Sequence, residues 1–395
     1  MLIEIYGAGF ANKGAQLMLE TTIDKIRSHH PEAKFAINAG ADRPPSEVRR
    51  LGVSFLWPSG TFHTGKKFWT PTFYKNKLKN TFHYFAKPSK LNVYGLVSRK
   101  QVDAFIDISG YSFGDFWGVK PLQHVSSLVD YYKTAGKPVV FLPQMLGPFK
   151  QTEVKTLFQG IAQKASLIYA REKSSFEESI SISPNAPIKI APDITIFSPK
   201  LDTNRFLPNE NRVCIVPNIR VTDSGVSPVS KVEYTDFLVG CARQVVAAGL
   251  TPVLVVHETF GADAELAKAV QKELSSQDIG IFTDPDPKAL KAFIGGSRFL
   301  IGSRFHSLVA ALSQKVPVIA FGWAHKYPQL LSDFDVPEFN LKTVGKGSTA
   351  TSLIETLIDE SGYTEVNQRI AAAFERLSVA NDQMWKEVFG ILGIA

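Results

Sequence analysis

Residues 298–314 read RFLIGSRFHSLVAALSQ. The apolar run 298–301 predicts a buried strand, and the apolar residues near the end of the stretch predict a helix. Arg304 and His306 therefore fall at a turn from strand to helix, where free backbone N–H groups favour an anion. Arg binds a carboxylate or phosphate through two parallel hydrogen bonds, and His can move a proton near neutral pH. The stretch predicts anion binding coupled to proton transfer.

A purely structural role for the same two residues stays open. Arg304 could hold a neighbouring loop, and His306 could pack in a core. Their position supports a functional role equally well, because parallel sheets bind ligands at the carboxyl ends of their strands.

Short strand patterns alternate with amphipathic helices along nearly the whole chain. The predicted strands are 2–6, 34–38, 53–56, 104–108, 138–142, 167–170, 188–191, 212–216, 252–257, 280–283, 298–301 and 316–321. The predicted helices are 15–28, 122–134, 151–164, 174–182, 231–248, 262–275, 288–295 and 305–314. This alternation predicts an α/β fold class with two doubly wound, Rossmann-like domains that face a cleft.

The length of the chain also argues for two domains. A chain of 395 residues is longer than one hydrophobic core usually serves. The polar, proline-containing stretch 198–205 has no periodicity and marks a break. We therefore predict an N-terminal domain over residues 1–203 and a C-terminal domain over 204–395, with a terminal helix at 364–389.

The composition, with 44% hydrophobic residues and a mean hydropathy of −0.02, is typical of a soluble globular protein. The first residues open directly on a strand pattern without the features of a secretory signal, and no apolar run approaches the ~20 residues that cross a bilayer. Cys214 and Cys241 lie in apolar contexts and are expected to be buried free thiols. These features predict a cytoplasmic protein.

The net charge of +7 comes from one segment. Residues 65–100 hold nine cations and no Asp or Glu, so the rest of the chain carries −2. Eight aromatic residues are interleaved with these cations, which argues against a purely solvated loop. We expect this segment to contact an anionic glycan, or to make a peripheral contact with the anionic inner face of the membrane, rather than to bind nucleic acid.

Polar residues also follow other predicted strands, at the sheet edge where ligands bind. The candidates for substrate binding are Asn12, Gly14, Ser109, Gly110, Asp115, Gln144, Arg171, Arg220 and Ser303. The glycine-rich turn 7–14 matches neither the dinucleotide nor the Walker spacing, and a purely structural turn stays an alternative. Arg171 could likewise form a simple ion pair with Glu172.

Two classes of site are not indicated. The eight histidines are scattered without a His-x-x-x-His pair, so no metal site is predicted. A Ser-His-Asp hydrolase is not supported either, because the chain has no G-x-S-x-G turn.

Taken in order, these elements resemble the polysaccharide pyruvyl transferase family. The resemblance runs from about residue 6 to about residue 335 and rests on residues 12–14, 114–115, 142–149, 170–177, 191–193, 302–308, 317–321 and 326. Its most specific part is Arg304 and His306, followed by the strand at 317–321 and by Lys326. Tyr111 is a departure, since the family commonly has bare backbone at that point.

The resemblance implies a glycosyltransferase-B-like enzyme that transfers pyruvate from phosphoenolpyruvate onto two hydroxyls of a sugar. The product would be a cyclic ketal in a cell-surface polysaccharide or its lipid-linked precursor. His306 would be the general acid/base, Arg304 would bind one anion of the donor, and Lys326 would neutralise the departing phosphate. Arg171 or Arg220 would bind the second anion. No metal or organic cofactor is implied, because phosphoenolpyruvate is itself an activated donor.

Two other hypotheses stay open. A glycosyltransferase of the same fold would use Arg304 to bind the diphosphate of a nucleotide sugar. A non-catalytic module would bind a glycan or a lipid carrier, and His306 would then be dispensable. The acceptor sugar, the stereochemistry of the ketal and the oligomeric state do not follow from the sequence.

Overall fold

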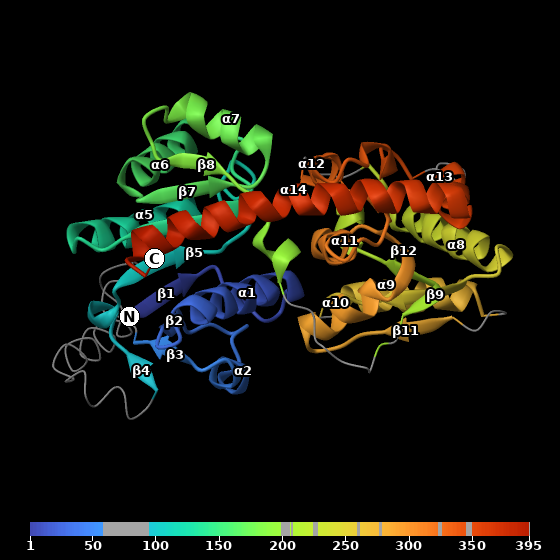
Figure 1. Cartoon of the computed structure of the whole chain (residues 1–395), viewed down its shortest axis with the longest axis horizontal. Helices are drawn as coiled ribbons and strands as arrows, with labels where there is room; N and C mark the ends of the chain where they lie inside the picture. The colour runs from blue at the N-terminus through green and yellow to red at the C-terminus, as the bar shows by residue number, and fades with distance from the viewer. Residues whose placement is uncertain are drawn as a thin grey trace, which may run out of the picture.

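The computed structural model describes residues 1–57, 95–198, 206, 208–223, 228–258, 261–275, 279–322, 326–344 and 350–394. These residues form two β-sheets that lie side by side along the longest axis of the molecule (Figure 1). All pairings between the named strands in the described residues are parallel. The predicted α/β class with two parallel sheets is confirmed.

The first sheet has the strand order β4-β3-β2-β1-β5-β6-β7-β8. Its strands are β1 (Leu2–Tyr6), β2 (Lys34–Asn38), β3 (Val53–Leu56), β4 (Leu96–Val97), β5 (Ala104–Asp107), β6 (Val139–Gln144), β7 (Leu167–Ala170) and β8 (Ile188–Ile190). The chain winds outward in one direction from β1 and in the other from β5. The gap between these two strands is therefore a topological switch point, the place where such sheets bind ligands.

Helices cover both faces of the first sheet. They are α1 (Lys13–His29), α2 (Pro45–Arg50), α5 (Val119–Thr134), α6 (Thr152–Lys164) and α7 (Lys173–Ile182). The apolar side of α1 packs in one core cluster with β1 and β2, whereas α5 and α6 pack in another with Phe105 and Phe141. Asn12 begins α1 by accepting a hydrogen bond from the Gly14 amide at 2.9 Å.

The second sheet has the strand order β11-β10-β9-β12-β13-β14, with its switch point between β9 and β12. Its strands are β9 (Asn209–Val216), β10 (Thr251–Val255), β11 (Gly280–Phe282), β12 (Ser297–Gly302), β13 (Val318–Phe321) and β14 (Asn340–Leu341). Its helices are α8 (Lys231–Ala247), α9 (Ala262–Glu273), α10 (Pro287–Gly295), α11 (Phe305–Leu312), α12 (Lys326–Asp333) and α13 (Thr351–Ile358). The predicted turn at Arg304 thus joins β12 to α11.

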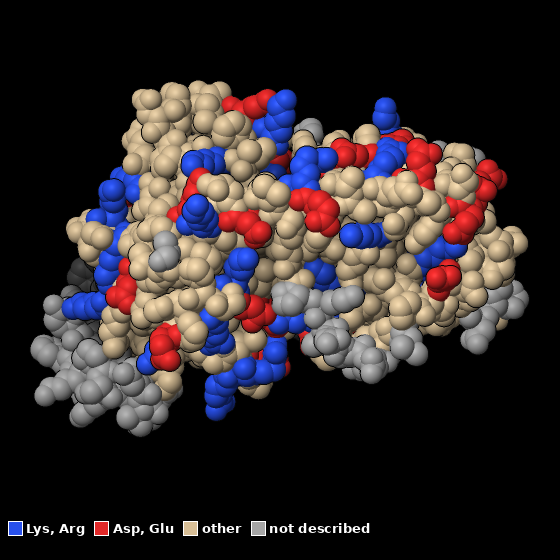
Figure 2. Space-filling view, viewed as in Figure 1, with Lys and Arg blue, Asp and Glu red and all other residues tan. Residues whose placement is uncertain are grey.

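The long helix α14 (Glu360–Leu392) crosses both halves of the molecule (Figure 1). Val366 and Ile370 near its start pack in the core of the second sheet, and Trp385 and Phe389 near its end pack in the core of the first. Lys and Arg side chains are interspersed with Asp and Glu over the face that it crosses (Figure 2). The helix therefore ties the two sheets together through apolar contacts and leaves a mixed-charge surface outside.

Direct contacts between the halves fix the first turn of α1 against the second sheet. Asn12 forms an isolated β-bridge with Glu258, and the Lys13 ammonium donates to the Pro285 carbonyl. Lys288 of α10 forms an ion pair with Asp24 of α1, at 2.7 Å between Nζ and Oδ2. The turn at the end of β1 consequently faces the ends of β10 and β11.

Part of the basic segment predicted at 65–100 can be located. Residues 65–94 lie outside the described residues, so the docking role predicted for them stays a prediction. Arg99 is described, and its Nε and Nη2 donate to the two carboxylate oxygens of buried Glu4 at 2.8 and 3.0 Å. This cation belongs to the fold, because the Glu4 carboxylate on β1 would otherwise be buried without a charge partner.

No helix within the described ranges is long and apolar enough to cross a membrane.

Candidate active site

A pocket of about 260 Å³ lies where the two switch points face each other. Its lining comes from the carboxyl ends of β1, β5, β7, β9, β10 and β12 and from the start of α12. The lining residues are Asn12, Ala15, Met18, Ser109, Gly110, Tyr111, Trp117, Arg171, Asn218, Arg220, His257, Glu258, Arg304, Phe305, His306, Lys326 and Tyr327. A pocket of this size has room for a small metabolite, and cationic and aromatic side chains dominate its wall.

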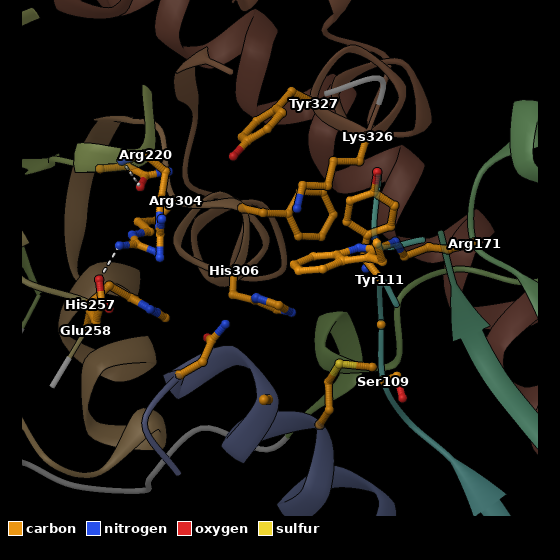
Figure 3. Close-up of a pocket in the computed structure, with 17 residues that line it drawn as sticks. Ser109, Tyr111, Arg171, Arg220, His257, Glu258, Arg304, His306, Lys326 and Tyr327 are labelled. Carbon is orange, nitrogen blue, oxygen red and sulfur yellow. Dashed lines mark hydrogen bonds and ion pairs between the residues drawn. The ribbon is translucent and has the colours of Figure 1, made fainter. Parts of the chain in front are cut away.

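Most of the residues chosen from the sequence line this pocket. They are Asn12, Ser109, Gly110, Arg171, Arg220, Arg304, His306 and Lys326. In Figure 3, Arg220 and Arg304 lie on one side, Arg171 and Lys326 lie on the other, and His306 lies between them. The structure therefore brings together side chains that are up to 314 positions apart, between 12 and 326.

Three other residues chosen from the sequence do not line the pocket, because their polar groups are used within the fold. The Asp115 carboxylate accepts the amides of Lys150 and Gln151 at 2.7 and 3.1 Å. The Gln144 side chain is fully buried and donates to Asp107 at 3.0 Å. Ser303 is buried, and its carbonyl accepts hydrogen bonds from Asn218 and Tyr327.

Gly14 is the remaining candidate, and its role depends on having no side chain. A Cβ atom at this position would lie 1.9 Å from Nδ1 of His306. The imidazole therefore packs directly on the backbone of the first turn of α1. Gly14 acts on His306 rather than on a ligand.

His306 faces the pocket with a buried Nε2 that has no hydrogen-bond partner among the described residues. Burial lowers its pKa from the usual value of 6.5, the Asp193 carboxylate opposes this shift, and the Arg171 cation adds to it. We infer that the ring is neutral near pH 7 and can accept a proton. The buried, unpartnered nitrogen needs a partner, which a ligand in the pocket can supply.

Arg304 is held by two carboxylates. Its Nε donates to Asp263 at 2.6 Å, and its Nη2 contacts both Asp263 and Glu258. The Asp263 side chain is fully buried and also accepts the Ile219 amide at 2.9 Å. Arg304 thus holds a neighbouring loop, which is the structural role left open above, while it also lines the pocket. Its charge is already compensated, so an incoming anion would meet Glu258 beside it.

Arg171 forms a buried network with two carboxylates and keeps one nitrogen unpaired. Its Nε donates to Glu172 at 2.8 Å, and its Nη1 donates to Asp193 at 2.9 Å. The ion pair with Glu172 that the sequence suggested is present. The third nitrogen, Nη2, is buried and has no partner among the described residues. An N–H donor of Arg171 is therefore available at the pocket.

Lys326 is surrounded by aromatic rings. Its Nζ lies 5.1 Å from the centre of the Phe305 ring, 5.6 Å from that of Tyr327 and 5.7 Å from that of Tyr111. Burial, and then the Arg171 cation, lower the pKa of Lys326 to about 8. Within the described part of the chain, Nζ makes no ion pair. Glu172 and Asp193 act on Lys326 without forming an ion pair with it, so Nζ keeps its hydrogen-bond donors for a ligand.

Arg220 lies at the exposed edge of the pocket. Its side chain is 66% exposed and pairs with Asp223 at 2.9 Å between Nη1 and Oδ2. Arg171 and Arg220 are the two cations considered for the second anion of a donor. Of these two, Arg171 has a buried N–H donor without a partner among the described residues.

Several lining residues were not chosen from the sequence. They are Ala15, Met18, Tyr111, Trp117, Asn218, His257, Glu258, Phe305 and Tyr327. His257 and Glu258 follow β10, so the strand-end rule that selected the other residues could have found them. Burial, followed by the charges of His306 and Arg304, lowers the pKa of His257 to about 3, so its ring is also neutral near pH 7.

In the described ranges, no group of three or more His, Cys, Asp or Glu side chains is arranged to hold a metal ion.

We expect Gly14→Ala to lower kcat by about 10²-fold, because the added methyl group displaces the His306 ring from its position. Steady-state kinetics of the purified variant measure this loss. Gly160→Ala in α6 is the matched control, because a Cβ there meets nothing within 4 Å and should stabilise the helix by about 0.5–1 kcal/mol without changing activity. Equal kcat for Gly14→Ala and the wild type would show that the ring position is not critical.

Solved structures that resemble this chain share its fold at low sequence identity. Anabaena HepE in complex with UDP-glucose is 16% identical with a TM-score of 0.57, and covers 98% of this chain and 99% of its own. S. aureus MnaA with UDP is 12% identical with a TM-score of 0.59, over 100% of this chain and 97% of its own. A UDP-GlcNAc 2-epimerase from Neisseria meningitidis is 11% identical with a TM-score of 0.58, over 97% and 100%. The predicted glycosyltransferase-B-like arrangement is confirmed.

No curated protein sequence matches the chain. The model of one protein family, described as polysaccharide pyruvyl transferase, matches residues 12–325. This range includes nearly every residue that lines the pocket.

Proposed function

The chain belongs to the polysaccharide pyruvyl transferase family, and from this membership we propose that it transfers pyruvate from phosphoenolpyruvate onto a sugar of a cell-surface polysaccharide or its lipid-linked precursor. The family supports pyruvyl transfer. The donor, the acceptor and the roles of the residues below are our proposal.

One observation carries the choice of donor. Within the described part of the chain, three nitrogen atoms without a directly bonded carboxylate belong to residues that line the pocket: Nη2 of Arg171, Nζ of Lys326 and Nε2 of His306. Phosphoenolpyruvate presents a carboxylate and a phosphate on adjacent atoms, so it needs N–H donors from more than one direction. Because nearby carboxylates balance Arg171 and Arg304, directed hydrogen bonds rather than a general positive field would hold the donor.

The proposed reaction has two steps, an addition that takes up the proton of the first hydroxyl and a displacement in which the proton of the second hydroxyl leaves with the phosphate. A sugar hydroxyl adds to C2 of phosphoenolpyruvate, and the methylene carbon takes up a proton to become a methyl group. The second hydroxyl then displaces phosphate and closes the cyclic ketal, so the products are the ketal and one inorganic phosphate. His306, neutral near pH 7, is suited to accept the proton of an attacking hydroxyl. Lys326 is suited to stabilise the departing phosphate.

We predict that purified protein incubated with pyruvyl-labelled phosphoenolpyruvate and a cell-envelope glycan fraction transfers label into an acid-labile ketal. Phosphate should be released in an equal amount, which a coupled phosphate assay measures. His306→Ala is the control for transfer by a contaminating enzyme. Label incorporation that does not differ between the two proteins, or phosphate release without ketal, would contradict the proposal.

A glycosyltransferase that uses a nucleotide sugar is the second candidate, because structures of the same fold hold UDP-glucose in HepE and UDP in MnaA. Their identities of 16% and 12% support the fold alone. A thermal shift with UDP-glucose that phosphoenolpyruvate does not reproduce would favour this candidate. A shift with phosphoenolpyruvate that UDP-glucose does not reproduce would favour pyruvyl transfer.

A further inference from the structure

Three aromatic rings gather at the mouth of the pocket on the loop that follows β5. Phe116 and Trp117 are 60% and 47% exposed, which is unusual for side chains of this size. The Tyr111 and Phe116 rings are stacked, with centroids 6.2 Å apart. The Trp117 ring stands at 72° to Tyr111 and 89° to Phe116. The rings therefore form a corner, and Tyr111 and Trp117 also line the pocket.

The backbone beneath these rings is fixed. Asp115 accepts the amides of Lys150 and Gln151, and its own amide donates to the Pro148 carbonyl at 2.8 Å. Phe113, which is 1% exposed, anchors the loop in the core and bridges to Leu146. These contacts explain why Asp115 does not reach the pocket. They also fix the backbone that carries the rings, so binding would not have to order the loop first.

The corner adjoins the proposed donor site. The Tyr111 ring is 5.7 Å from Nζ of Lys326, and Lys326 in turn lies against Phe305, on which Arg171 also stacks. A molecule that rests on Tyr111 and Trp117 is therefore next to the cations proposed for phosphoenolpyruvate. This is the position that an acceptor hydroxyl must occupy to reach C2 of the donor.

We propose that Tyr111 and Trp117 form the acceptor subsite and bind a pyranose ring of the glycan by stacking. This inference rests on the proposed function and adds to it the residues that select the acceptor. One face of a pyranose carries C–H groups with partial positive charge, which match the negative face of an aromatic ring, while its hydroxyls stay free at the edge. Phe116 does not line the pocket and supports Tyr111 from outside.

Saturation-transfer NMR tests binding without requiring transfer. The probes are the methyl glycosides of glucose, galactose, mannose and N-acetylglucosamine. At least one should receive saturation at its ring C–H protons from the wild type. Trp117→Ala should weaken that binding by about 3- to 10-fold, Trp117→Phe should keep part of it, and Phe116→Ala should have a smaller effect. Tyr131→Ala, which removes an exposed aromatic ring outside the pocket, is the matched control.

The phosphoenolpyruvate-induced shift in Tm should be the same in Trp117→Ala as in the wild type. The inference is overturned if none of the four glycosides receives saturation, or if Trp117→Ala leaves the signal unchanged. It is also overturned if saturation reaches UMP but no glycoside, which would indicate a nucleobase site. Equal losses of binding to anionic liposomes in Trp117→Ala and Phe116→Ala, with glycoside binding intact, would identify a membrane contact instead. Glycoside binding that depends on Trp117 without ketal formation would keep this inference and reject the proposed function.

Discussion

His306→Ala should lower kcat for pyruvyl transfer by about 10²- to 10⁴-fold while the protein still binds phosphoenolpyruvate. The imidazole has a buried Nε2 without a partner among the described residues, and the Arg171 and Lys326 cations that we assign to the donor lie near enough to help lower its pKa. Its removal takes away the group that accepts a proton but leaves Arg171 and Lys326 in place. Stopped-time assays of ketal formation measure kcat, and the ligand-induced shift in Tm measures donor binding.

His306→Gln is the matched variant, because glutamine can accept a hydrogen bond in the same space but cannot shuttle a proton. It should be nearly as impaired as His306→Ala. The pH profile gives a second check: the pKa of His306 is lowered to about 4, so the neutral base is present at pH 7 and is lost only as the pH falls toward that value. The phosphate of the donor also titrates near pH 6 and adds its own effect to the acid side of the profile. The part of the acid-side loss of activity that is due to His306 is the part that disappears in His306→Gln. Full activity in either variant would remove His306 from the mechanism.

Lys326→Met should raise the KM for phosphoenolpyruvate by roughly 30-fold or more. Loss of one partner from a buried charge pair costs about 2–5 kcal/mol, and each 1.4 kcal/mol is a factor of about ten. Methionine keeps most of the apolar stem against Phe305 and Tyr111, so the change is mainly one of charge. Lys155→Met on α6, an exposed lysine outside the pocket, is the control.

The pH dependence of kcat/KM separates charge from packing at Lys326. Its pKa in the free enzyme is lowered to about 8, so the cation is present below that pH and is lost above it. The free-enzyme profile should therefore fall above pH about 8. Lys326→Arg should move this limb to higher pH, since guanidinium does not deprotonate in that range. A limb that stays near pH 8 in Lys326→Arg belongs to another group.

The sequence predicted the central strands of the two sheets better than the short strands at the sheet edges. Every predicted strand overlaps an observed one, because buried parallel strands flanked by helices leave a clear apolar pattern. β4 and β14 are two residues long and form only because a neighbouring strand pairs with them, so they have no pattern of their own. α12 was missed: Lys326, at its start, was selected as part of the family resemblance, and no helix was predicted there.

The sequence could predict which strand ends carry the polar residues of the candidate site. Arg171, Arg304 and His306 were found by that rule. It could not tell a side chain that faces the pocket from one that is used within the fold: Asp115 accepts loop amides, and Gln144 donates to the buried Asp107 carboxylate.

The partners of Arg304 were not predictable, because Glu258 and Asp263 come from a connection more than 40 positions away. Trp117 was missed because it lies ten positions beyond the end of β5, where a strand-end rule no longer applies.

The course of α14 has a consequence for how the protein is made. Its last turns supply Met384, Trp385, Val388 and Phe389 to the core of the first sheet, whose strands end at residue 190. A ribosome adds about 5–20 residues per second, so the first sheet waits through the synthesis of about 200 further residues before its core is complete. During that interval its apolar face is uncovered where α14 will pack. The core of the N-terminal half is therefore completed only when the last turns of α14 emerge and pack against it.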